Sequence, residues 1–154
     1  FNNVRAAFEF GVPAESTVNG RAYLMLGGIS EIAEEAEDLT AALPPFGRME
    51  SIEPDSSDGG DFTVSGYALD NRGVVSVEAR VDETHDVPLS YGISRPDVCI
   101  AWPGYPDCSL VGFTGPLPAA LFGGGPECGH SVEIIATDTD GNARVIDSHL
   151  VYAE

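Results

Sequence analysis

The stretch Val74-Val-Ser-Val-Glu-Ala-Arg-Val81, which follows the turn sequence Asp70-Asn-Arg-Gly73, decides the fold class of this chain. Its apolar residues recur at every second position, with polar or charged residues between them. This alternation is typical of a strand with one face in a core and the other in water. The residues expected on the buried face are Val75, Val77, Ala79 and Val81. The preceding stretch, Phe62–Leu69, is a second predicted strand.

The β-pattern continues through the rest of the chain after Pro45. Further strands are predicted at Leu110–Phe113, Ser131–Thr137 and Ala143–Tyr152, with a long loop from Asp82 to Asp107. The sequence Asp138-Thr-Asp-Gly-Asn142 indicates a hairpin turn, because an Asp-Gly pair accepts the positive φ angles that tight turns need. Strands joined by turns, without helices between them, are typical of an antiparallel β-sandwich.

The first 44 residues follow a different pattern. Residues 3–12 alternate as a strand does, and their apolar face consists of Val4, Ala6, Phe8, Phe10 and Val12. A second short strand is predicted at Arg21–Leu26. Ser30–Leu43 changes to a period of three or four and predicts one amphipathic helix, with Ser30 as its N-cap. We therefore expect an assembly element of strand and helix over residues 1–44 and a β-sandwich over residues 45–154.

Composition excludes some classes of partner. The 154-residue chain has a formal net charge of −18, and all 7 of its basic residues are Arg. So acidic a chain repels phosphate backbones, which argues against nucleic-acid binding. No apolar run approaches the roughly 20 residues that a membrane-spanning helix needs. The lack of Lys suits a medium rich in salt or calcium, where counterions screen the carboxylates, and a genomic preference for Arg codons explains it equally well.

The cysteines favour an oxidising compartment. Cys99 and Cys108 have eight residues between them in a Pro- and Gly-rich stretch, a spacing that closes a small disulfide ring. A zinc site would need four ligands at short spacings, and the sequence lacks them. The chain begins at Phe1 without a leader pattern, so either a leader has been removed or the chain is a fragment. We expect an exported protein, extracellular or at the cell surface, in which Cys128 is an odd thiol, buried or intermolecular.

Three groups of residues carry a resemblance to a known family. They are Gly66–Asp70 with Gly73–Glu78; Tyr91-Gly92 with Arg95–Cys108 and Val111–Phe113; and Gly129–Ser131 with Ala136–Asp138 and Gly141-Asn142. On these stretches, residues 45–154 resemble a bacterial immunoglobulin-like module of secreted and surface proteins. The resemblance implies an immunoglobulin-like sandwich and an exported location. It implies no activity, because such modules are non-catalytic parts of many proteins.

Nucleophilic catalysis is not indicated. The sequence offers His85, His130 and His149, but no Gly-x-Ser-x-Gly elbow that would present a nucleophilic serine. Cys128 and His130 are two residues apart and lack a third group that would orient them. The histidines are therefore interpreted as loop or solvent-facing residues, and the chain is expected not to be an enzyme.

Two acidic stretches are candidates for calcium, because they gather oxygen ligands around glycines. Their candidate ligands are Asp55, Asp58 and Asp61 in the first stretch and Asp138, Asp140 and Asn142 in the second. Neither fits the twelve-residue calcium loop with its terminal Glu. A solvated loop explains the first stretch and a hairpin turn explains the second, so no cofactor is expected beyond possible calcium.

Three aromatic residues, Tyr91, Trp102 and Tyr105, lie in or near the stretch that contains Cys99 and Cys108. If they are exposed together, they could stack on a sugar or insert into a partner surface. The alternative is that Trp102 folds inward and caps the core of the sandwich.

These patterns lead to two hypotheses for function. The first is a non-catalytic structural subunit of an extracellular assembly or filament, in which the strand over residues 3–12 pairs with a neighbouring copy. The alternative is that this strand pairs within its own chain, since its apolar face needs a sheet that buries it. The second hypothesis is an accessory or carbohydrate-binding domain of a secreted hydrolase, with glycan as its ligand.

Overall fold

A computed structural model of the chain describes residues 24–41, 43–54, 61–123 and 128–152. The chain divides into two compact units, Phe1–Glu37 and Asp38–Glu154. The predicted strand over residues 3–12 and the acidic residues Asp55 and Asp58 lie outside the described residues, and so do residues 21–23 of the predicted strand Arg21–Leu26. The rest of that prediction is wrong, because residues 24–26 do not form a strand.

The predicted helix is present as α1, Ile29–Ala41, but it begins differently from the expectation. The amide of Ile32 donates to the carbonyl of Gly28 at 3.0 Å, so Gly28 precedes the first turn. Glu31 Oε2 accepts the amide of Gly28 at 2.9 Å. A Glu in the first turn that satisfies the cap amide is half of a capping box. Ser30 therefore lies inside the first turn and is not the N-cap.

The second unit is mostly β, as predicted. Its strands are β1 (Phe46–Pro54), β2 (Phe62–Leu69), β3 (Val74–Val81), β4 (His85–Ile93), β5 (Gly112–Leu117), β6 (Gly129–Asp138) and β7 (Ala143–Tyr152). They form one antiparallel sheet in the order β1-β2-β5-β4-β3-β6-β7. Two short helices also occur, α2 (Pro96–Ala101) and the 3-10 helix η1 (Ala119–Leu121), so the expectation of strands without intervening helices is wrong in detail.

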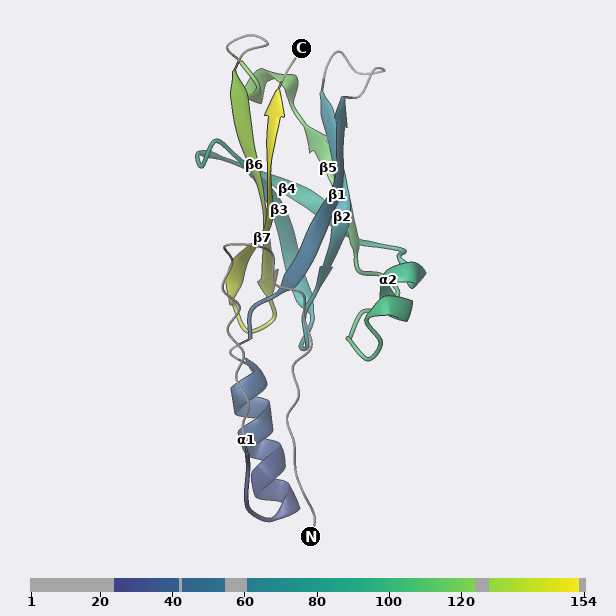
Figure 1. The fold of residues 1–154 in the computed structure, drawn as a ribbon, viewed down its shortest axis with the longest axis vertical. Coiled ribbons are helices and arrows are strands. Elements are labelled where there is room, and N and C mark those ends of the chain that lie inside the picture. The colour runs from purple at the N-terminus through teal and green to yellow at the C-terminus, as the bar shows by residue number, and fades with distance from the viewer. Residues whose placement is uncertain (1–23, 42, 55–60, 124–127, 153–154) are drawn as a thin grey trace, which may run out of the picture. The chain divides into compact units, whose positions relative to one another are not determined.

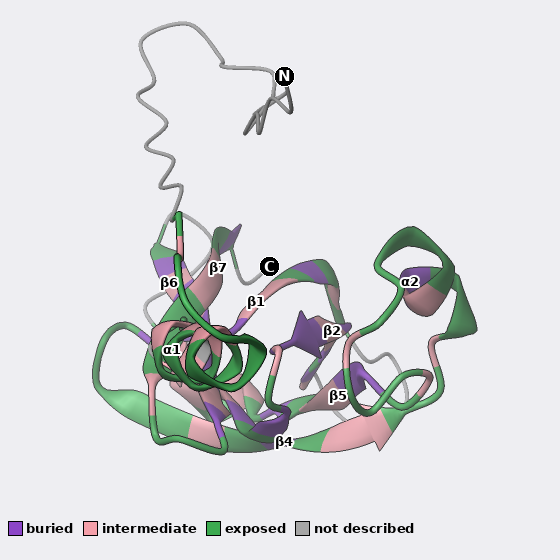
Figure 2. Cartoon of the chain, turned by 90° about the horizontal axis from the view of Figure 1, so that it is seen from below, coloured by how far each residue is buried: buried purple, intermediate pink, exposed green. Residues whose placement is uncertain are grey.

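The sheet curls into a nearly closed barrel because β4 changes partner along its length. Its first half pairs with β3, from His85 opposite Val81 to Leu89 opposite Val77. Its second half pairs with β5, beginning with Ser90 opposite Thr114. In Figure 2 the strands ring a common interior, and α2 lies outside the ring beside β2 and β5. The long loop predicted from Asp82 to Asp107 is therefore wrong over β4 and α2.

The interior of the ring is apolar. Its fully buried side chains include Met49, Val64, Phe113, Leu117, Val132 and Ile134. Of the residues predicted for the buried face of β3, Val77, Ala79 and Val81 are buried, whereas Val75 is exposed. The register of β3 against β6 shifts between Val74 and Ser76, and this irregularity places Val74, and not Val75, in the core.

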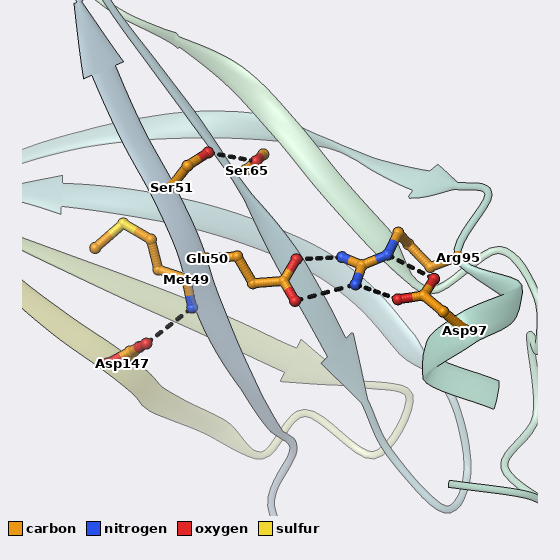
Figure 3. Close-up of polar contacts among 7 residues, drawn as sticks. All are labelled: Met49, Glu50, Ser51, Ser65, Arg95, Asp97 and Asp147. Atoms are coloured by element: carbon orange, nitrogen blue, oxygen red, sulfur yellow. Dashed lines mark hydrogen bonds and ion pairs between the residues drawn. The ribbon is translucent and has the colours of Figure 1, made fainter. Parts of the chain in front are cut away.

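The two end strands of the sheet are β1 and β7, labelled in Figure 1, and they contact each other. The amide of Met49 donates to Asp147 Oδ2 at 2.9 Å, a contact drawn in Figure 3. A Cβ atom at Gly47 would lie 2.1 Å from the carbonyl oxygen of Tyr67 on β2 and 2.8 Å from Cδ1 of Ile146 on β7, so the main chain of β2 is the first reason for glycine here. Among the described residues no main-chain ladder joins these two strands, and the barrel has a seam here.

Candidate functional site

The segment between β4 and β5, residues 94–111, is tied by a disulfide and is here called the stapled segment. Cys99 and Cys108 form the bond, with their Cα atoms 5.6 Å apart. Pro96 begins α2, a position where the missing amide hydrogen of proline costs nothing. Figure 1 shows this segment outside the ring of strands, at the side of β2 and β5.

A small second core attaches the stapled segment to the sheet. Val98 and Val111 of the segment and Leu69 of β2 are buried together. Phe46, Tyr67, Cys99 and Tyr105 pack against these three residues and are partly buried. Because Tyr67 and Leu69 alternate with Ala68 of the interior, they belong to the outer face of β2. The stapled segment therefore covers the outside of the sheet and does not cap its interior.

The structure separates the three predicted aromatic residues. Trp102 and Tyr105 both contact the ring of Phe46 edge-on, with centroids 5.2 and 5.3 Å apart respectively. Trp102 keeps 45% of its surface exposed. Tyr91 packs against the main core, and its hydroxyl donates to the carbonyl of Ala68 at 3.1 Å. Burial raises the pKa of Tyr91, and the nearby acids add to the rise.

Trp102 borders a hollow of about 180 Å³, here called the Trp102 hollow. Its lining residues are Glu50, Tyr67, Arg95, Asp97, Val98, Ala101 and Trp102. They come from β1, β2 and the stapled segment, so the site exists only where the segment packs on the sheet.

Arg95 organises the charges of the Trp102 hollow (Figure 3). Its guanidinium binds both carboxylate oxygens of Glu50, one of them at 3.0 Å, and both oxygens of Asp97 at 2.9 and 2.7 Å. The carbon of the guanidinium lies 5.7 Å from the ring centroid of Tyr67, within the range of a cation–π contact. The hydrogen bonds from Arg95 lower the pKa of Asp97 to about 2. Asp97 is therefore ionised at neutral pH beside a cation that two carboxyl groups hold in place.

Tyr105 lies in a different place from the Trp102 hollow. It borders a second hollow, of about 250 Å³, together with Leu43, Pro44, Phe46, Asp70, Asn71 and Arg144. Trp102 and Tyr105 thus share Phe46 as a support but line separate surfaces.

His130 is a buried structural residue, contrary to the expectation of a solvent-facing histidine. Its Nδ1 lies 2.7 Å from Asp82 Oδ2, and its Nε2 lies 2.8 Å from the carbonyl oxygen of Gly123. Both nitrogens face acceptors, so both donate when the ring is protonated. The hydrogen bond with Asp82 raises the pKa of His130 and lowers that of Asp82. A ring with both nitrogens engaged in this way is not poised as a catalytic base.

The other groups considered for nucleophilic chemistry are dispersed. His85 Nδ1 lies 2.9 Å from the hydroxyl of Thr84, and His149 lies partly exposed on β7. Cys128 is exposed, which contradicts the buried alternative of the two that the sequence left open, a buried or an intermolecular thiol.

The acids predicted as calcium ligands have other roles where the structure describes them. Asp138 is buried, and its Oδ1 accepts the amides of Asp140 and Asn142 at 2.9 and 2.8 Å. Its Oδ2 accepts the side chain of Asn142 at 2.7 Å. Burial by itself would raise the pKa of Asp138, but these hydrogen bonds outweigh it and the pKa is lowered. The carboxylate holds the hairpin turn, as the turn interpretation expects.

Asp140 and Asp61 are also engaged. Asp140 Oδ2 lies 2.8 Å from Nε of Arg72, and Asp61 Oδ1 accepts the amide of Ala119 at 2.8 Å. Within residues 24–41, 43–54, 61–123 and 128–152, no group of three or more His, Cys, Asp or Glu side chains is arranged to hold a metal ion. The helices of these same ranges are too short or too polar to cross a membrane.

Sequence reasoning named Trp102 but missed Glu50, Tyr67 and Arg95, which complete its surroundings. Glu50 and Arg95 are 45 positions apart, and no local pattern links them. The one available signal was the outward position of Tyr67 on a strand whose other face is buried.

Comparison with protein-family models, curated proteins and solved structures finds no match for this chain.

Proposed function

We propose that residues 46–152 form a non-catalytic, immunoglobulin-like module of an exported protein. The strand order supports this assignment. Lettered A to G along the chain, the strands follow A-B-E-D through β1-β2-β5-β4 and then C-F-G through β3-β6-β7. The two sheets of a constant-type immunoglobulin sandwich have these same two strand orders, which supports the proposal. In this chain β4 also pairs with β3 and links the two sheets into one.

Export is supported by the disulfide between Cys99 and Cys108. Disulfides of this structural kind persist in oxidising compartments and are rare in reducing ones. The doubly engaged ring of His130 supports a non-catalytic role. The resemblance to bacterial immunoglobulin-like modules points the same way.

The function that we infer for the module is that of a structural subunit in an extracellular assembly. One observation carries this inference, the apolar outer face of the end strand β7. Leu150 and Tyr152 pair with Ser131 and Gly129 of β6, which alternate with buried residues, and therefore point away from the core. Leu150 and Tyr152 are 59% and 56% exposed, and Val145, near the beginning of β7, is exposed as well.

An end strand with apolar side chains on its outer face is a site where another strand can add to the sheet. The sequence offers such a strand in residues 3–12, one face of which consists of Val4, Ala6, Phe8, Phe10 and Val12. When this strand comes from a neighbouring copy, its apolar face extends the surface of Leu150 and Tyr152. Head-to-tail contacts of this kind build a filament when they do not close into a ring.

Paired variants of the full chain test the assembly. Phe8→Ser with Phe10→Ser removes the apolar face of the strand, and Arg5→Ser with Glu9→Ser changes its other face as a matched control. Analytical ultracentrifugation and negative-stain imaging should show a folded monomer for the first pair and assemblies for the second. Assemblies that persist in the first pair, or a parent chain that is monomeric throughout, would contradict the proposal.

A further inference from the structure

Beyond a role in assembly, we propose that the Trp102 hollow is a carbohydrate-binding site that holds one neutral sugar ring of a glycan. The hollow combines a half-exposed tryptophan with polar groups that are held in place, which is the composition that sugar rings need. Their C–H faces stack on aromatic rings, and their hydroxyls both donate and accept hydrogen bonds.

Trp102 supplies the stacking surface. The ring of Phe46 packs against the indole in a T-shaped contact, with 68° between the two ring planes, and this contact holds the indole in place. The indole follows directly after α2, whose Cys99 is tied to Cys108. A ring fixed in this way loses little conformational entropy when it binds a ligand. The 45% exposed surface of Trp102 is then available for stacking.

Arg95 and its two acids supply the polar contacts. The guanidinium is held from both sides, by Glu50 and Asp97, and is fixed before a ligand arrives. The side chains of Glu50 and Asp97 remain 40% and 65% exposed. Carboxylate oxygens accept more than one hydrogen bond, so both acids can still receive sugar hydroxyls.

The charge of the hollow selects the class of sugar. By formal charge, one arginine and two acidic residues give the hollow a net negative charge, in keeping with the acidic balance of the whole chain. Uronic acids and sulfated sugars are therefore repelled, whereas neutral sugars are not. A volume of about 180 Å³ suits a single ring, with the rest of the glycan outside.

The chain contains one tryptophan, and this makes the test direct. Intrinsic fluorescence is followed while the full chain is titrated with neutral oligosaccharides built from glucose, xylose, mannose or N-acetylglucosamine. Oligogalacturonate serves as the anionic comparison. We expect a saturable change in Trp102 emission with at least one neutral oligosaccharide and none with oligogalacturonate. No change with any neutral oligosaccharide would overturn the proposal.

Variants locate the binding by calorimetry. Trp102→Ala should weaken the affinity by about tenfold or more, because the stacking surface is lost. Tyr105→Phe is the control, since it keeps the aromatic ring that packs in the small second core and lies outside the Trp102 hollow, and its affinity should be unchanged. Equal losses in both variants, or none in Trp102→Ala, would contradict the site. The pair Phe8→Ser with Phe10→Ser should retain full affinity, which separates this site from assembly.

Discussion

Nδ1 of His130 on β6 lies 2.7 Å from Oδ2 of Asp82, the first residue after β3. The second oxygen of Asp82 accepts the amide of Ser131 at 2.9 Å. One carboxylate thus joins the end of β3 to the start of β6, and the other nitrogen of the histidine reaches Gly123. The pair ties together three segments that are far apart in the sequence.

The first prediction concerns the pH dependence of this pair. The pKa of His130 is raised above 6.5 in the folded chain, so its stabilisation is complete below that pH and is lost as the pH rises through the raised value. The pKa of Asp82 is lowered below 3.8, so its contribution is lost only as the pH falls through the lowered value. His130→Ala should therefore reduce the free energy of unfolding by about 2 kcal/mol near pH 5.5 and by less near pH 8.5.

Urea unfolding at the two pH values measures this difference. His149→Ala is the control, because His149 is partly exposed on β7 and should change stability by less than about 0.5 kcal/mol at both. The same loss of stability at both pH values in His130→Ala would refute the protonated pair.

The second prediction contrasts two buried acids. Burial raises the pKa of Asp70, and the charge of Asp138 adds to this, while the amide of Arg72 opposes it. Ionisation of Asp70 therefore disfavours the folded state, and Asp70→Asn should raise the unfolding midpoint at neutral pH. This gain should vanish below about pH 3.8, where the carboxyl is protonated in both folded and unfolded chains.

Asp138→Asn should act in the opposite direction. The NH2 group that replaces Oδ2 cannot accept a hydrogen bond from the side chain of Asn142, so the hairpin turn should lose about 1–3 kcal/mol. Thermal unfolding of both variants at neutral pH gives the comparison. If the two midpoints shift in the same direction, the assigned charge balance is wrong.

The third prediction concerns the disulfide. Replacing Cys99 and Cys108 by Ala opens a ring that spans a sequence separation of 9, which should cost about 3 kcal/mol. The loosening should be concentrated in the stapled segment. The amides of Val98 and Val111 should exchange faster and the Trp102 emission should shift to the red, while the far-ultraviolet circular dichroism of the sheet is retained.

Cys128→Ala is the control for the disulfide variant, because it removes a cysteine outside the stapled segment. Its hydrogen exchange should match that of the parent chain. Unchanged exchange at Val98 after loss of the disulfide would show that the small second core holds the segment by itself.

Local pattern was sufficient for those strands whose alternation is regular. β2, β3, β6 and β7, and the turns at Gly73 and Gly141 with their positive φ, follow directly from it. β1 was not predicted, because its register shifts between Met49 and Ser51. Its core residues Met49 and Ile52 are therefore three positions apart and break the alternation expected of a strand. In β4, Pro88 and Gly92 resemble loop residues, although Pro88 lies opposite Glu78 within the sheet.

The site was less predictable than the fold because it is assembled from long-range contacts. The spacing of Cys99 and Cys108 indicated the staple and drew attention to Trp102. Nothing local indicated that the segment would settle on the outer face of β1 and β2, where Leu69 is buried by it. Because the segment packs on this outer face, Trp102 lies apart from Tyr91 in the main core and lines a different hollow from Tyr105.

The most direct test of strand addition between copies is a mixing experiment. One chain carries Phe8→Ser with Phe10→Ser and cannot donate its strand, and the other carries Val145→Ser with Leu150→Asp and cannot accept one. Sedimentation velocity should show each variant alone as a monomer and the equimolar mixture as a one-to-one dimer, because only one donor and one acceptor remain. Assemblies formed by either variant alone, or a mixture that stays monomeric, would contradict the account.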